Sequence, residues 1–256
     1  MLLAAIIAGN VSQSFGSNKI IFIMLSMALC IGLSMGVGLL YSYGRLPIII
    51  ATIGIALLYE AITCVLYNGS GVKLIADTSL KSFSTYPLVL VPLAAAIIIY
   101  AFYSYKTIAG KKGQLLANNQ QAAVNIGIGE IKNVLITYLF SGILFGCATI
   151  VYASTDTHAG SFSSLATVGE LFVNILPVFI GLIIARYCGD TLGIILGSLT
   201  ICLMNFGLKA AFTAEIGSAV STICIGVFML VVNVAGSQGG VMVSGLKHMF
   251  QRQKSA

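Results

Sequence analysis

The sequence predicts an all-α protein, a polytopic transmembrane helical bundle of about eight membrane segments. Three observations predict this class. Of the 256 residues, 58% are hydrophobic and only 8% are charged, and the apolar residues form runs of about 20, the length that crosses a bilayer. A soluble domain must face water with its exterior, so this composition excludes one.

The membrane segments follow one another along most of the chain. A helix over residues 1–15 would rise only about 22 Å, short of the roughly 30 Å hydrocarbon core, and it lacks the basic start of a signal peptide. The longer apolar runs predict spans at 20–40, 46–67, 87–105, 134–153, 166–185, 191–208 and 218–235. We expect one transmembrane domain over 1–256, with a polar loop at 106–132.

Lysine and arginine residues between the spans predict the orientation. If the loop 106–132 is cytoplasmic, nine basic residues lie inside: Arg45, Lys106, Lys111, Lys112, Lys132, Arg186, Lys247, Arg252 and Lys254. Four lie outside: Lys19, Lys73, Lys81 and Lys209. This bias follows the positive-inside rule and places both chain ends in the cytoplasm. Because the basic residues are spread singly, the net charge of +6 indicates topology and not nucleic-acid binding.

Small residues at four-residue spacing predict close helix packing in lipid. The pattern occurs at Gly32 and Gly36, at Gly142 and Gly146, and at Gly189, Gly193 and Gly197. The six cysteines are scattered without a C-x-x-C spacing, so we interpret them as small core residues. No metal and no cofactor is expected.

The longest polar interruption runs from Gly110 to Lys132, GKKGQLLANNQQAAVNIGIGEIK. Asn119 is a good N-cap, residues 120–126 can form two helical turns, and Gly127 is a good C-terminal stop. So short a helix is marginal in water and needs a docking surface, where the small Ala122 and Ala123 would allow close approach. The alternative is a solvated loop with a helical kink.

Residues 119–128, preceded by Gly110, resemble the cytoplasmic coupling loop of ribose-type ABC importer permeases. That loop usually reads Gly, then Gly-Gly-Asn-x-x-Ala-Ala-x-x-x-Gly-Ile; here Ala117 and Asn118 replace the two glycines. The resemblance implies that an ATPase subunit docks on this loop. The matching positions are Gly110, Asn119, Ala122, Ala123, Gly127 and Ile128.

The resemblance continues along nearly the whole chain. Matching elements are Gly44-Arg45-Leu46-Pro47, Asn68-Gly69, Glu170-Leu171 and Asn205-Phe206-Gly207-Leu208. Two departures stand out. Family members commonly carry two more spans before the point where this sequence starts, so residues 1–15 resemble the remainder of their third span. Residues 184–188 replace a Gly-Gly-rich cytoplasmic turn.

Candidate solute contacts lie at membrane depth, where a carboxylate is costly and therefore a functional candidate. Glu170, Asn174, Pro177, Gly181 and Ala185 recur at helical spacing and predict one small or polar face toward the bundle interior or a wet cavity. The alternative for Glu170 is a structural hydrogen bond at a span end. We expect Glu170, Asn174 and, through the resemblance, Asn205 to bind solute. Glu60 is a second intramembrane acid.

Together these features predict a permease subunit of a bacterial ABC importer in the inner membrane, importing a monosaccharide or related small polar solute by ATP-driven alternating access. The resemblance implies three partners: an ABC ATPase, a second permease subunit and an extracytoplasmic solute-binding protein. No catalytic motif occurs, so the chain is expected not to be an enzyme. The alternatives are an ion-coupled secondary transporter, in which Glu60 or Glu170 carries the proton, and a truncated membrane subunit that does not transport.

Overall fold

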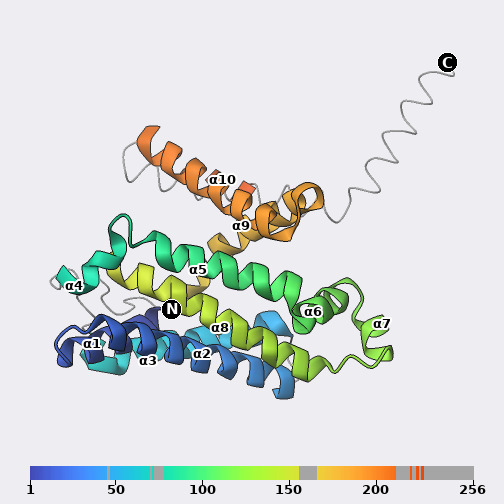
Figure 1. The fold of residues 1–256 in the computed structure, drawn as a ribbon, viewed down its shortest axis with the longest axis horizontal. Coiled ribbons are helices and arrows are strands. Elements are labelled where there is room, and N and C mark those ends of the chain that lie inside the picture. The colour runs from blue at the N-terminus through green and yellow to red at the C-terminus, as the bar shows by residue number, and fades with distance from the viewer. Residues whose placement is uncertain are drawn as a thin grey trace. The chain divides into compact units, whose positions relative to one another are not determined.

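The structure, a computed structural model, describes residues 1–44, 47–69, 71, 78–155, 166–211, 220, 223–224 and 226–227. All regular structure in these ranges is helical, which confirms the predicted class (Figure 1). In chain order the elements are α1 (Leu2–Ser14), α2 (Lys19–Gly44), α3 (Ile48–Val65), η1 (Leu66–Gly69), α4 (Thr78–Lys81), η2 (Ser82–Ser84), α5 (Leu90–Ala101), η3 (Phe102–Lys106), α6 (Ile108–Asn118), α7 (Gln120–Asn125), α8 (Glu130–Thr155), α9 (Ala166–Cys188) and α10 (Asp190–Ala211).

The chain divides into two compact units, Met1–Val168 and Gly169–Ala256, and each is described by itself. Within the described residues, three helical stretches are long and apolar enough to cross a membrane: α2, α8 and Asp190–Leu208 of α10. A fourth candidate is the bent pair Leu90–Lys106 and Ile108–Leu116. The structure therefore supports three or four spans and not the predicted eight. The predicted segment 218–235 lies mostly outside the described residues.

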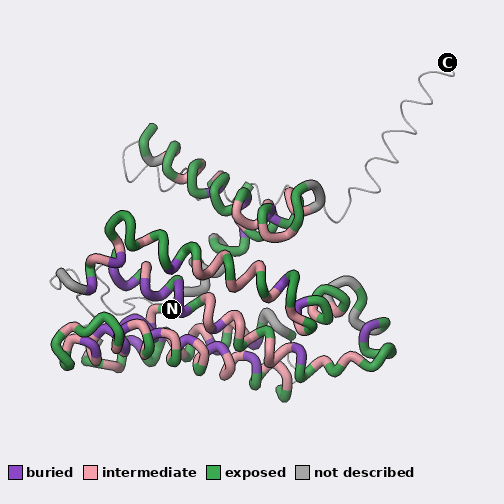
Figure 2. The backbone as a smooth tube through the Cα atoms, viewed as in Figure 1, coloured by how far each residue is buried: buried purple, intermediate pink, exposed green. Residues whose placement is uncertain are grey.

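The first unit is built on the long helix α8. It packs most extensively along α2 and also contacts α1, α5 and α6. The two long helices run antiparallel, because Cys30 of α2 bonds to Thr149 whereas Ser34, one turn later, bonds to the carbonyl of Tyr138. A buried cluster closes one end of this unit (Figure 2). Its members are Ala5, Ile6, Ala8, Phe22, Leu80, Phe83, Ile150 and Ala153.

Glycines bring α2 and α8 close together. A Cβ at Gly142 would lie 2.6 Å from the Cα of Ile31, and one at Gly146 would lie 2.6 Å from the Sδ of Met27. The predicted packing role is confirmed for this pair. It is wrong for Gly32, which has no atom within 4 Å of a Cβ position.

In the second unit, α9 and α10 approach backbone to backbone. A Cβ at Gly193 would lie 2.5 Å from the carbonyl oxygen of Gly181, and one at Gly197 would lie 2.6 Å from the carbonyl oxygen of Pro177. Gly189, the first glycine of the predicted series, has a different feature. It lies between the two helices with a φ of +85°, a left-handed conformation that favours glycine.

The cysteines are free thiols that differ in burial, and Cys224 is half-buried. Cys30 and Cys147 are buried, as expected of small core residues. Cys64, Cys188 and Cys202 are exposed on the protein surface, so the core interpretation is wrong for these three. In a membrane protein such thiols are suited to face lipid, because a free thiol behaves as a small hydrophobic group.

Candidate functional site

The candidate coupling loop begins where the chain turns sharply out of the α5–η3 segment. The helix axis bends by 74° between Leu90–Lys106 and Ile108–Leu116. Thr107 sits at the bend in an extended conformation and caps α6, accepting a hydrogen bond from the Gly110 N–H at 3.0 Å. Its hydroxyl also donates to the carbonyl oxygen of Tyr103 at 2.6 Å. One hydroxyl thus stabilises both sides of the turn.

Gly110 makes this turn possible. A Cβ at this position would collide with the carbonyl oxygen of Tyr103 and lie 3.1 Å from the Oγ1 of Thr107. The obstacle is main chain, which cannot rotate away as the end of a flexible side chain can. Gly110 is therefore required for the bend, a structural role that is separate from any contact with a partner.

The short helix α7 follows and is capped at both ends, as the sequence predicts. The side chain of Asn119 accepts a hydrogen bond from the Ala122 N–H at 3.1 Å. At the other end Gly127 has a φ of +90°. The Gly127 N–H donates to Val124 and the Ile128 N–H donates to Ala123, the bonding pattern of a Schellman motif.

The two alanines of α7 have different environments. Ala123 is 3% exposed, and α7 packs against α6 within the same chain. Ala122 is exposed, with Val124 and Ile126. The expectation that both alanines admit a partner is therefore wrong for Ala123, whose small size serves internal packing. The exposed apolar positions of α7 and its C-cap are Ala122, Val124 and Ile126, and we call these three positions together the α7 face.

A buried amide fixes α6 to the start of α8. Asn133 is 5% exposed. In the orientation that satisfies both amide atoms, its nitrogen donates to the carbonyl oxygen of Ala109 at 3.1 Å and its oxygen accepts from the Gly113 N–H at 3.3 Å. A second link joins η3 to α8, where the Tyr103 hydroxyl lies 2.7 Å from the Oγ1 of Thr137. The loop is thus braced at its base.

Neither brace was predicted. Asn133 stands between the predicted polar loop, which ends at residue 132, and the predicted span, which begins at residue 134, and no role was predicted for it. The signal that could have identified it is its position: a lone amide one turn into a membrane helix must find partners within the protein. Thr107 also had a usable signal, since Thr three residues before Gly110 can serve as an N-cap.

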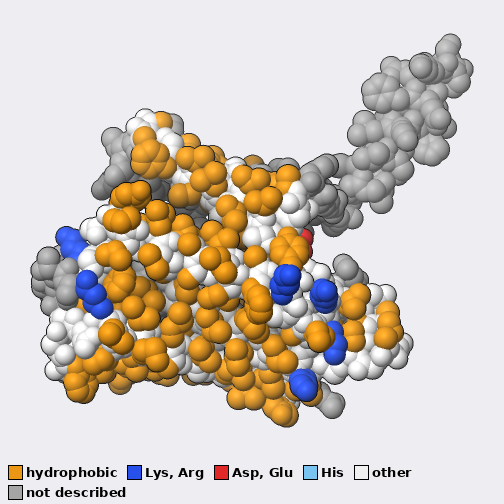
Figure 3. Space-filling model, viewed as in Figure 1, with side chains coloured by type: hydrophobic (Ala, Val, Ile, Leu, Met, Phe, Trp, Pro, Cys, Tyr) orange, Lys and Arg blue, Asp and Glu red, His pale blue; other side chains and the backbone are white. Residues whose placement is uncertain are grey.

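Lysine side chains of the first unit gather at two opposite ends (Figure 3). Lys19 lies over the Phe83 ring, 5.9 Å from its centroid, and Phe83 belongs to the buried cluster at the carboxyl end of α8. Lys106, Lys111, Lys112 and Lys132 lie in η3, α6 and the start of α8. The described lysines of the first unit therefore form two groups, and the orientation of the chain in the membrane stays a prediction. Arg45, Lys73, Lys247, Arg252 and Lys254 lie outside the described residues.

The candidate solute residues lie on two helices. Asn174 is exposed on α9 and Asn205 is half-buried on α10, while the Glu170 side chain lies outside the described part of the chain. The predicted small face divides in two, because Pro177, Gly181 and Ala185 pack directly against glycines of α10. That half of the face therefore turns toward the bundle interior, the first of the two predicted alternatives, and solute binding by Glu170, Asn174 and Asn205 stays a prediction. Within the described residues, no three His, Cys, Asp or Glu side chains gather as metal ligands.

These features define a helical membrane protein with several candidate spans and a braced helical loop at one end of its first unit. Sequence comparison gives the relatives. The chain is 24% identical over 215 residues to the autoinducer 2 import system permease protein LsrC of Photorhabdus luminescens, covering 81% of this chain and 62% of the relative. It is 24% identical over 230 residues to the galactose/methyl galactoside import permease protein MglC of Haemophilus influenzae, covering 80% and 67%.

A third relative is LsrC of an Enterobacter species, 32% identical over 135 residues, which covers 50% of this chain and 39% of the relative. The chain is thus a distant homologue of ribose-type ABC importer permeases, which confirms the resemblance. It spans 39% to 67% of the length of these relatives. No family model and no solved structure matches it.

The homology and the candidate spans confirm a multi-pass protein of the bacterial inner membrane. Permease subunits of ABC importers are transport components and not enzymes, in agreement with the expectation for this chain.

Proposed function

We propose that this chain is the membrane permease subunit of an ABC importer that takes up a monosaccharide or a related small polar solute by ATP-driven alternating access. The proposal includes about eight membrane segments in the complete bundle. Its partners would be an ABC ATPase, a second permease subunit and an extracytoplasmic solute-binding protein. Distant homology to import permeases for autoinducer 2 and for galactose supports this class.

The observation that carries the proposal is the form of α7. A helix of six residues is marginal on its own, yet α7 is capped at both ends and packs against α6. Its outer side shows Val124 at 45% and Ile126 at 80% exposure, both apolar. On this proposal the ATPase covers the α7 face and its movement is passed through α6 to α8 by the Asn133 brace.

The solute would be bound by Glu170, Asn174 and Asn205, with loop positions Gly110, Asn119, Ala123, Gly127 and Ile128 shaping α7. Asn174 and Asn205 each already make an interaction within the structure, and an amide can exchange such a bond for a sugar hydroxyl. Both groups suit sugar hydroxyls, because an amide donates and accepts hydrogen bonds and a carboxylate accepts them from the hydroxyl.

The test uses charge at an exposed position. Ala122→Glu places a carboxylate in the α7 face, and an uncompensated charge buried by a partner costs several kcal/mol, about 3–5. We expect at least tenfold less ATPase to co-purify with the variant, while the membrane level of the permease is unchanged. The matched control is Thr85→Glu, also an exposed position but outside the loop. Normal ATPase binding and uptake by Ala122→Glu would show that α7 is only a linker.

A proton-coupled transporter is the second candidate, favoured by Glu60, which is 6% exposed on α3. Buried carboxylates within a membrane are typical of proton relays. The two functions differ in their energy source. Uptake that stops when the proton gradient is collapsed at constant ATP would support proton coupling, and uptake that stops on ATP depletion at constant gradient supports the importer.

A further inference from the structure

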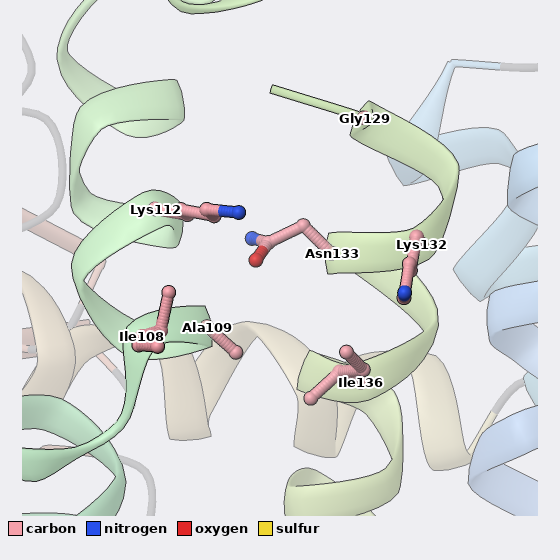
Figure 4. Close-up of a pocket in the computed structure, with 7 residues that line it drawn as sticks. All are labelled: Ile108, Ala109, Lys112, Gly129, Lys132, Asn133 and Ile136. Atoms are coloured by element: carbon pink, nitrogen blue, oxygen red, sulfur yellow. The ribbon is translucent and has the colours of Figure 1, made fainter. Parts of the chain in front are cut away.

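A cavity of about 190 Å³ lies between α6 and the first turns of α8 (Figure 4). Its lining residues are Ile108, Ala109, Lys112, Gly129, Lys132, Asn133 and Ile136. Pockets that bury drug-sized ligands measure about 300–1,000 Å³, so this cavity suits a smaller chemical group. Apolar side chains and two ammonium groups line it together.

Both helices that line this cavity contribute a positively charged side chain. Lys112 comes from α6 and Lys132 from α8, and Lys112 extends toward Asn133 (Figure 4). Glu130 stands nearby in the first turn of α8 but does not line the cavity. The Asn133 amide is already bonded to the α6 backbone and offers the lysines no negative charge.

The cavity also lies where membrane segments end. The α5–η3 segment ends at Lys106, α6 then leaves at 74°, and α8 begins at Glu130. Ile108 is 73% exposed, Leu115 is 54% exposed and Ile131 is 46% exposed, all close in sequence to lysines. Exposed apolar residues interleaved with lysines are typical of a helix at the boundary between headgroups and acyl chains.

We propose that this cavity binds the phosphodiester headgroup of an anionic phospholipid. Lys112 and Lys132 contact the phosphate oxygens, and Ile108 and Ile136 contact the glycerol and the upper acyl chain. Basic pockets between membrane helices on the cytoplasmic side bind such headgroups, and each lysine near an anionic surface contributes enough to change affinity about fivefold. A zwitterionic lipid carries a balancing cation and binds less well.

The experiment measures how phosphatidylglycerol raises the unfolding temperature of the full chain in detergent, with phosphatidylcholine as the reference lipid. We expect stabilisation by phosphatidylglycerol alone. The half-saturating concentration should rise about fivefold for Lys112→Gln or Lys132→Gln and about 25-fold for the double variant. The charge-preserving Lys132→Arg should bind as the unaltered chain does.

Two controls separate the cavity from general surface charge. Lys111→Gln removes an exposed lysine of α6 that does not line the cavity, and it should leave the affinity unchanged. Ala109→Leu keeps both lysines but fills part of the cavity, and it should weaken binding as the lysine variants do. An equal loss in Lys111→Gln, or unchanged affinity in the double lysine variant, would overturn the proposal. Equal protection by millimolar inorganic phosphate would also overturn it, because the site would then bind soluble anions.

Discussion

The α2–α8 contact and the α9–α10 contact are both built with glycine, but they differ in what the glycines meet. In the first, Gly142 of α8 meets the main chain of Ile31, whereas Gly146 meets the side chain of Met27, and side-chain hydrogen bonds add to the contact. In the second, Gly193 meets the main chain of Gly181 and of Ala185. The α2–α8 contact thus combines main-chain and side-chain neighbours, whereas the glycines of the α9–α10 contact meet main chain alone.

This difference decides how each contact tolerates added volume. A side chain can change rotamer to admit a methyl group, whereas main chain moves only if the whole helix moves. The α9–α10 contact should therefore be the more sensitive one.

The largest effect is expected for Gly193→Ala. The added Cβ would lie 2.5 Å from the Gly181 oxygen and 2.7 Å from the Ala185 nitrogen, so the helices must separate. Overpacking typically costs 1–3 kcal/mol, and we expect about 3 kcal/mol here. Reversible unfolding in mixed micelles would measure it. A loss in free energy of unfolding smaller than that of Gly146→Ala in α8 would contradict the distinction between the two contacts.

A smaller effect is expected for Gly146→Ala. The nearest atom to its Cβ is the Sδ of Met27, at 2.6 Å, and the Cα of Met27 lies at 3.1 Å. Methionine is flexible and can adjust, so the expected loss is about 1 kcal/mol. Gly32→Ala is the control in α2, because no atom lies within 4 Å of its Cβ position. The same unfolding measurement should show no loss for this control.

The smallest effect is expected for Thr149→Val. The change removes the contact of 3.2 Å between the Thr149 Oγ1 and the Cys30 Sγ while it keeps the shape of the side chain. Hydrogen bonds between membrane helices average about 0.6 kcal/mol, and we expect a loss of that size or less in the same unfolding measurement. A loss greater than that of Gly146→Ala would show that polar bonds dominate the α2–α8 contact.

The sequence predicted the coupling loop better than the solute path, and the reason is physical. Caps are local: Asn119 and Gly127 act on main-chain atoms a few residues away, so their effect can be read from spacing alone. The face of α9 was predicted from periodicity. Periodicity indicates that small residues share one side of the helix, but it does not indicate which element covers that side. Periodicity therefore left open whether Gly181 and Ala185 line a cavity or pack within the bundle, and the structure shows that they contact α10.

The bend before α6 shows a second limit. Lys111 and Lys112 beside two glycines indicated a polar loop, yet residues 108–118 are helical. Tertiary contacts override the weak local preference here, because Thr107 caps the helix and Asn133 binds its backbone. The Asn133 contacts join residues 24 and 20 positions apart and are invisible to a local pattern.

The Asn133 brace has a consequence for how this region can diverge. Both of its bonds go to main-chain atoms of α6, at Ala109 and Gly113, so the attachment does not depend on which side chains α6 carries. Substitutions on the exposed side of α6 can therefore accumulate without detaching it from α8, provided that an amide remains at position 133. In a comparison of many relatives, the exposed positions of α6 that do not line the cavity should vary freely while Gly110 and position 133 stay constrained, and those exposed positions are the natural places to attach a spectroscopic probe without disturbing the loop.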